Sequence, residues 1–216
     1  AFSSGLEAAV QGGAVRNAEE LSRYVVELLT IGIGEREAVA VGLAHEAYLS
    51  GSLESAVEAD RELEAMKLGR ESRTASRQMG RQVIRLAANQ LAQQPLIEDY
   101  LAAVEADRTP GHCAVSFGLT LAVAGWSKED SIAAYLYQTA TGYVAAAMKR
   151  LGVKAVTGAV TASKVKRALD ALVARADANA AVIGRFVEKS SGLGQLAVDP
   201  STRSNTSVCL SIVDPA

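Results

Sequence analysis

A row of arginines between positions 70 and 85 is the residue pattern with the clearest chemical potential. Its members are Arg70, Arg73, Arg77, Arg81 and Arg85. Steps of three and four residues place all five guanidinium groups along one face of a helix. Because like charges four residues apart repel each other, this basic stripe predicts acidic helices packed beside it or the carboxylates of a partner. A plain solvated face is the alternative.

The same helix contains apolar and small residues that predict how it packs. The residues opposite the basic stripe, predicted to form its buried side, are Ala75, Met79, Val83 and Leu86. Gly80 lies in the helix interior, where glycine costs about 0.5–1 kcal/mol relative to alanine. We therefore expect a close approach of another element at Gly80, with Ala75 and Ser76 on the preceding turn allowing the same contact.

His112 and Cys113 form the second candidate site. An imidazole beside a thiolate is a plausible transient site for a borderline metal such as nickel or copper. The alternative is structural, because Cys113 opens an apolar run and a free cysteine often behaves as a small buried hydrophobe. No firm metal site is predicted, since two histidines and two cysteines would nearly all be needed for one closed site.

Other chemistries are excluded by missing motifs. The chain has no G-x-x-x-x-G-K-[ST] phosphate loop and no G-x-G-x-x-G after a strand. Neither histidine belongs to a Glu-x-x-His pair or to a recognisable nucleophile elbow. We therefore predict a protein that is not an enzyme and that binds no cofactor tightly.

The elements that must position these residues are helices. Aromatics make up only 5% of the 216 residues, and apolar residues recur at helical spacing almost throughout. The predicted fold is all-α, a single-domain bundle of about eight to ten helices over residues 1–189, followed by a loose tail over 190–216. Ile132, Leu136, Thr139, Ala140, Tyr143 and Ala147 form the most regular stripe, which we expect to be buried. Gly32 and Gly34 are expected to interrupt an early helix, and a last long helix is expected from Ala162 to Val187.

Net charge, cysteine content and the first residues of the chain indicate which partners and which cellular compartment to expect. The net charge of −2 argues against nucleic-acid binding. No uncharged apolar run is long enough to span a bilayer, and the first residues lack the pattern of a signal peptide. Two cysteines fit a reducing compartment, so a cytoplasmic location is expected. The chain starts without Met, and we expect its natural start to be missing.

Five short segments, taken in order, resemble the UreF family of urease accessory proteins. Residues 3–10 resemble the S-x-G-L-E-x-x-V signature, residues 71–80 match E-x-R-x-A-S-x-x-M-G, and residues 111–118 match G-H-x-x-x-x-F-G. Residues 134–137 and 149–151 resemble the following A-Y-L-Y and R-L. The motif residues that this resemblance assigns to partner binding are Ser3, Gly5, Glu7, Glu71, Arg73, Ser76, Gly80, His112, Phe117, Gly118, Tyr137 and Arg150.

The resemblance implies a helical, homodimeric scaffold without enzymatic activity. The resemblance further implies that the chain binds the accessory protein UreD (also called UreH) and the GTPase UreG and modulates that GTPase. The assembly would promote nickel insertion into apo-urease, with nickel only in transit. The similarity ends after residue 151, where the family continues with P-L-G-Q, and residues 201–216 lack the family's H-E and R-L-F. Two alternatives stay open: a stand-alone metal carrier using His112 and Cys113, and a non-catalytic helical subunit of another enzyme complex.

Overall fold

The structure is a computed structural model that describes residues 5–91 and 93–151. These residues form helices joined by short connections, and no strand occurs within the two described ranges. The prediction of an all-α fold is therefore confirmed. The helix expected from Ala162 to Val187 and the tail over 190–216 lie outside the described residues.

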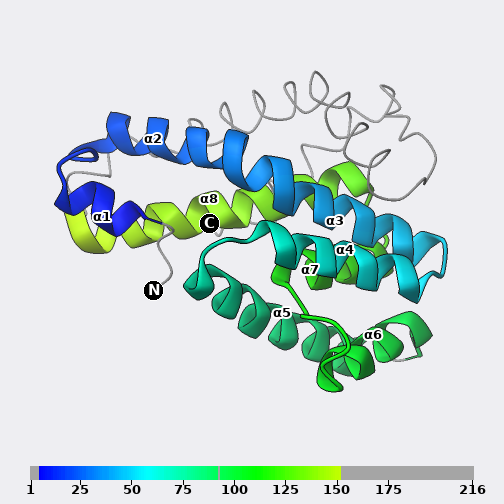
Figure 1. Cartoon of the computed structure of the whole chain (residues 1–216). Coiled ribbons are helices and arrows are strands. Elements are labelled where there is room, and N and C mark those ends of the chain that lie inside the picture. Colours follow the sequence, from blue (N-terminus) through cyan, green and yellow to red (C-terminus); the bar gives the residue numbers. More distant parts are fainter. Residues whose placement is uncertain (1–4, 92, 152–216) are drawn as a thin grey trace.

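The helices follow one another closely along the chain (Figure 1). Their bounds are α1 Leu6–Gln11, α2 Ala18–Glu27, η1 Leu28–Ile33, α3 Gly34–Leu49, α4 Leu53–Met66, α5 Arg70–Gln90, α6 Pro95–Glu105, α7 Cys113–Val123 and α8 Lys128–Leu151. None of these helices is long and apolar enough to cross a membrane.

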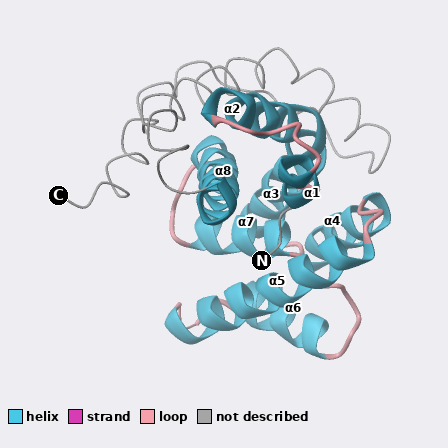
Figure 2. Ribbon diagram, turned by 90° about the vertical axis from the view of Figure 1, so that its left-hand side faces the viewer, coloured by secondary structure: helices cyan, strands magenta, loops and turns pink. Residues whose placement is uncertain are grey.

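The short helix α7 is the centre of the packing. It contacts α3, α5, α8 and α4, and Figure 2 shows it enclosed by its neighbours, with α5 and α6 forming a separate layer below α4. Most of α7 is buried, including Leu119, which is fully inaccessible to solvent. Gly118 allows the approach of α3, because a Cβ at this position would lie 3.0 Å from Cβ of Ala44. The element that carries His112 at its start is thus fixed on all sides.

Two helices begin with the side-chain caps that their sequences predict. The Asn17 side chain accepts hydrogen bonds from the backbone N–H groups of Glu19 and Glu20, both at 3.0 Å. Ser127 caps α8 by accepting from the backbone N–H of Asp130 at 3.1 Å. Such caps satisfy amide groups that the first turn of a helix leaves without partners.

Gly32 and Gly34 were expected to interrupt an early helix, but the chain stays helical through both residues. Residues Leu28–Ile33 form a π-helical turn that joins α2 directly to α3. Gly34 lies at the end of this turn, where a Cβ would lie close to the carbonyl oxygen of Leu29. The glycine therefore accommodates a wider helical turn, and the helix continues through it.

The predicted buried side of α5 was wrong. Met79 is 50% exposed and Leu86 is 60% exposed, and Ala75 and Val83 are only half-buried. The residues that α5 buries are Ser76, Gly80, Ile84 and Ala87. Small residues are required on this side because α5 approaches the backbone at the start of α7, and this orientation also brings the arginines towards acidic residues.

The regular stripe of α8 packs against the core as predicted. Leu136, Ala140, Tyr143 and Ala147 are buried, and Ile132 and Thr139 are partly buried. Next to this stripe, the rings of Phe117 and Tyr135 meet edge to face with centroids 5.5 Å apart. This aromatic contact joins α8 to α7.

Candidate functional site

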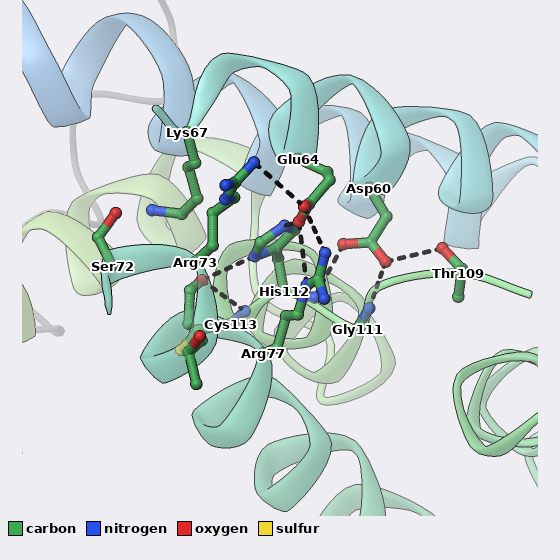
Figure 3. Close-up of polar contacts among 12 residues, drawn as sticks. Asp60, Glu64, Lys67, Ser72, Arg73, Arg77, Thr109, Gly111, His112 and Cys113 are labelled. Atoms are coloured by element: carbon green, nitrogen blue, oxygen red, sulfur yellow. Dashed lines mark hydrogen bonds and ion pairs between the residues drawn. The ribbon is translucent and has the colours of Figure 1, made fainter. Parts of the chain in front are cut away.

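The site is built around Asp60, a fully buried carboxylate on α4. Its Oδ2 accepts hydrogen bonds from the Thr109 hydroxyl at 2.7 Å and the Gly111 backbone N–H at 2.6 Å. Its Oδ1 accepts from the backbone N–H of His112 at 2.8 Å. A buried charge requires such partners, so Asp60 fixes the segment that leads into α7 (Figure 3).

Both ring nitrogens of His112 have partners. The Nδ1 atom lies 3.0 Å from the Ser76 hydroxyl on α5, and Nε2 lies 2.7 Å from Oε2 of Glu64 on α4. The side chain is completely buried. Burial lowers the pKa of His112, because it disfavours the imidazolium, although the nearby Asp60 and Glu64 carboxylates oppose this shift.

Glu64 also binds the basic stripe. Arg77 approaches it with two guanidinium nitrogens, Nε at 3.0 Å from Oε2 and a second nitrogen in contact with Oε1. Arg73 is more distant, at 3.8 Å. Partial burial alone would raise the pKa of Glu64, but its hydrogen bonds with Arg77 and His112 hold that pKa below the ordinary value. One carboxylate therefore joins α4, α5 and the start of α7 (Figure 3).

The remaining arginines of the stripe pair with acidic residues farther along. Arg81 lies 2.7 Å from Asp107, and Arg85 lies 3.1 Å from Glu105 at the end of α6. The expectation of acidic helices beside the basic stripe is thus confirmed for four of its five arginines; Arg70 is exposed at the start of α5. The stripe is half-exposed, so intramolecular pairing orients the guanidinium groups without covering them.

A second buried ion pair lies next to the residues that surround His112. Lys67 donates to Glu37 on α3, and the Tyr135 hydroxyl on α8 donates to the other oxygen of the same carboxylate. Burial, together with the Glu37 charge, raises the pKa of Tyr135 well above its ordinary value, which keeps the phenol protonated as a donor. We call all these side chains together the polar network: Glu37, Asp60, Glu64, Lys67, Arg73, Ser76, Arg77, Thr109, His112 and Tyr135.

The chemistry available at His112 and Cys113 is limited by their surroundings. Burial raises the pKa of the Cys113 thiol to about 11, with the Glu37 charge acting in the same direction. A metal ligand would have to be the thiolate, and both His112 nitrogens are already engaged. Among the residues that the structure describes, no group of three or more His, Cys, Asp or Glu side chains could hold a metal ion.

Gly80 is where α5 meets the start of α7. A Cβ on this residue would lie 2.6 Å from the backbone nitrogen of Cys113 and closer still to the carbonyl oxygen of Gly111. The predicted close approach is therefore present, but the partner is the backbone that precedes α7 rather than the side of another helix. Ser76, one turn earlier, uses its short side chain to reach His112.

The family-motif residues divide into three groups in the structure. The central ones, Arg73, Ser76, Gly80 and His112, come together in or against the polar network, whereas Glu71 is exposed. Phe117, Gly118 and Tyr137 pack around α7 and α8, and Gly5 and Glu7 lie at α1. Ser3 and the side chain of Arg150 lie outside the described residues.

Sequence reasoning missed the acidic half of the network. Asp60, Glu64 and Glu37 lie in helices that look ordinarily charged, and Lys67, the basic partner of Glu37, directly follows α4. One signal was present: Ala56, Asp60, Leu63 and Lys67 follow steps of four, three and four and are all buried. A charged residue within an apolar stripe indicates a buried pair rather than a solvated side chain.

Comparison with known proteins gives one consistent family. The UreF family model matches residues 15–166. Similar curated proteins, each named urease accessory protein UreF, occur in Actinobacillus pleuropneumoniae serotype 5b (27% identity over 147 residues) and Yersinia enterocolitica (26% over 152). A third, from Haemophilus influenzae, is 27% identical over 156 residues.

These alignments cover 68–72% of this chain and 64–66% of the relatives. The chain thus matches just under two thirds of the length of the first of these relatives. The family match includes every member of the polar network and begins after Ser3, Gly5 and Glu7.

Proposed function

The chain belongs to the UreF family of urease accessory proteins, and from this premise we propose that it is a non-catalytic scaffold for urease maturation. In this role it binds UreD (also called UreH) and the GTPase UreG. The resulting assembly promotes nickel insertion into apo-urease, and nickel passes through the assembly as cargo. We further propose that the chain acts as a homodimer in the cytoplasm.

The family match over residues 15–166 supports this role most directly, because it contains the whole polar network. The network holds two half-exposed arginines of the basic stripe, Arg73 and Arg77, beside Glu64. Arg73 is 38% exposed and only loosely paired, at 3.8 Å from Glu64. A guanidinium in this state can bind a partner's carboxylate without first breaking a tight internal pair.

The alternative of a stand-alone metal carrier at His112 and Cys113 has less support. Loading this pair would require breaking the contact of His112 with Glu64 or with Ser76. It would also require deprotonation of a buried thiol. A scaffold needs neither change. The other alternative, a subunit of a different enzyme complex, is not favoured by any specific contact.

Co-purification tests the scaffold role. The tagged chain is expressed with UreD, UreG and apo-urease from one urease gene cluster, and urease activity is measured after nickel addition. We expect co-purification of UreD and UreG, and activation that depends on the chain. Failure of both accessory proteins to co-purify would overturn the proposal.

Two arginine variants in the same assay test whether the basic stripe contributes to partner binding. Arg73→Ala should lower activation and make the residual binding less sensitive to salt, because screening acts on exposed charges. Arg23→Ala is the matched control, since Arg23 is an exposed helical arginine on α2, outside the stripe. Modulation of the GTPase is measured separately, as the change in GTP hydrolysis by UreG on addition of the chain.

A further inference from the structure

An open pocket of about 830 Å³ lies at the opposite end of α7 from His112. The eleven residues of α7 separate the two places. The pocket is lined by the end of α3, the end of α7 and the first turn of α8, and Leu49 and Ala122 contribute apolar surface. Leu49, the last residue of α3, is 70% exposed and so presents its side chain as an accessible apolar surface.

His45 lines this pocket and has an unused hydrogen-bonding atom. Its side chain is 3% exposed, and Nε2 lies 2.8 Å from the backbone carbonyl oxygen of Trp126. Because a carbonyl oxygen only accepts, Nε2 carries a proton and donates it to this contact. Nδ1 is buried and has no hydrogen-bond partner among the described residues. A buried polar atom of this kind is stabilised by a hydrogen-bond partner.

The charges around the pocket favour a cation. Lys128 pairs with Glu46 at 2.8 Å, so these two charges largely cancel. Glu129 and Asp130 on the first turn of α8 remain, and Asp130 accepts a hydrogen bond from the Ser127 hydroxyl at 2.8 Å. The pocket thus combines apolar walls, an excess of two carboxylates and a buried ring nitrogen without a partner among the described residues.

We propose that this pocket binds a lysine or arginine side chain of a partner protein. The aliphatic part of such a side chain packs against Leu49 and Trp126, and its cationic end lies at the carboxylates of Glu129 and Asp130 and supplies hydrogen-bond donors. A basic side chain therefore matches both the apolar walls and the carboxylates of the pocket. An acidic side chain would be repelled by the carboxylates, and a purely apolar one would leave them without a partner. The inference takes its partner proteins from the proposed scaffold function.

The first test needs no partner, because Trp126 is the chain's single tryptophan and lines the pocket. Tryptophan fluorescence is followed during titration with Nα-acetyl-lysine methylamide, Nα-acetyl-arginine methylamide and the uncharged Nα-acetyl-norleucine methylamide. We expect a saturable change with the two cationic probes and at least threefold weaker binding of the norleucine probe. Absence of a saturable change with both cations, or equal binding of norleucine, would overturn the inference.

Two matched pairs of variants locate the response. Glu129→Gln should weaken binding of the lysine probe at least threefold, while Glu98→Gln, an exposed first-turn glutamate on α6, should not. Leu49→Ala should weaken it as well, while Leu68→Ala, at another exposed leucine, should not. If the control variants weaken binding as much as the pocket variants, the probe binds elsewhere and the inference fails.

A second test separates this inference from the proposed function. The Leu49→Ala/Glu129→Gln double variant is assayed for binding to UreD, UreG and apo-urease, with a threefold or greater loss expected for one of them. Unchanged affinity for all three would refute docking at the pocket and leave the scaffold role intact. If the parent chain itself bound none of them, the scaffold role would fail, and the probe titrations would still decide whether the pocket takes a basic side chain.

Discussion

The Nε2 atom of His112 lies 2.7 Å from Oε2 of Glu64, which joins a fully buried imidazole to a carboxylate that is 22% exposed. His112 immediately precedes α7, Glu64 is in the last turns of α4, and Arg77 of α5 binds the same carboxylate. The consecutive helices α4 and α5 and the later helix α7 are therefore joined at one carboxylate. Predictions about stability follow from how each partner contacts it.

Arg77 should contribute more to stability than Arg73. Arg77 binds Glu64 through two nitrogens, whereas Arg73 is 3.8 Å away and both are partly exposed. We expect Arg77→Ala to cost about 1–2 kcal/mol and Arg73→Ala about 0–0.5 kcal/mol. Urea denaturation of both variants measures this order, and a larger loss for Arg73→Ala would contradict the assigned geometry.

Adding one methyl group at Gly80 should destabilise the fold. The new Cβ would overlap backbone atoms of residues 111–113, which cannot rotate away as a flexible side chain could. We expect Gly80→Ala to cost about 2–3 kcal/mol. Gly142→Ala on α8 is the control: a Cβ there meets nothing within 4 Å, so the same change should stabilise by about 0.5–1 kcal/mol. Thermal melts of the two variants should move in opposite directions.

Asp60→Asn should be more damaging than its small change in shape suggests. The carboxylate accepts three hydrogen bonds, and an amide would present N–H₂ to at least one of those donors. We expect a loss of at least about 3 kcal/mol in the free energy of unfolding, measured by chemical denaturation. The control is Asp99→Asn on the exposed side of α6, which should change stability by less than about 0.5 kcal/mol.

Alkaline pH should weaken the fold through Cys113. Its pKa is raised from 9.0 to about 11 on folding, so the unfolded chain releases this proton first and stability falls as pH rises from 9 towards 11. Between pH 8 and pH 10.5 the loss from this group is about 2 kcal/mol. Cys113→Ala lacks the group, so the stability difference between parent and variant should shrink by that amount. A constant difference across this range would show that the thiol titrates normally.

The sequence was sufficient to predict α5 and its arginines but not the side that α5 buries. Apolar periodicity favoured Met79 and Leu86 as core residues, yet both are exposed. The deciding factor is non-local: the backbone at the start of α7 requires Gly80 and Ser76 at the contact, and Glu64, Glu105 and Asp107 attract the arginines. None of these partners can be placed from the sequence of α5 alone.

Asp60 likewise could not be predicted as a site residue from the sequence of its own helix. His112, Ser76, Arg73 and Gly80 could be selected from motif spacing, because they lie in recognisable segments. Asp60 lies in an acidic helix, and its role depends on a connection some fifty residues later that folds back onto it. Only the contact between the two segments distinguishes this carboxylate from its exposed neighbours.

The π-helical turn at Leu28–Ile33 has a consequence for the helical phase of the long rod made by α2 and α3. Leu21, Val25, Leu29 and Ile33 are all buried and recur every four residues. In an unbroken α-helix each such step rotates a side chain about 40° past its predecessor, so the row would spiral away from the core. A π turn holds more residues than an α turn and turns the row back. The helix thereby carries one additional residue without losing its alignment, so deleting a single residue such as Thr30 would leave an ordinary α-helix whose C-terminal half, with Val41 and Ala44, still faces the core. Winding the same residues as an α-helix without a deletion would instead rotate that half by about 100°.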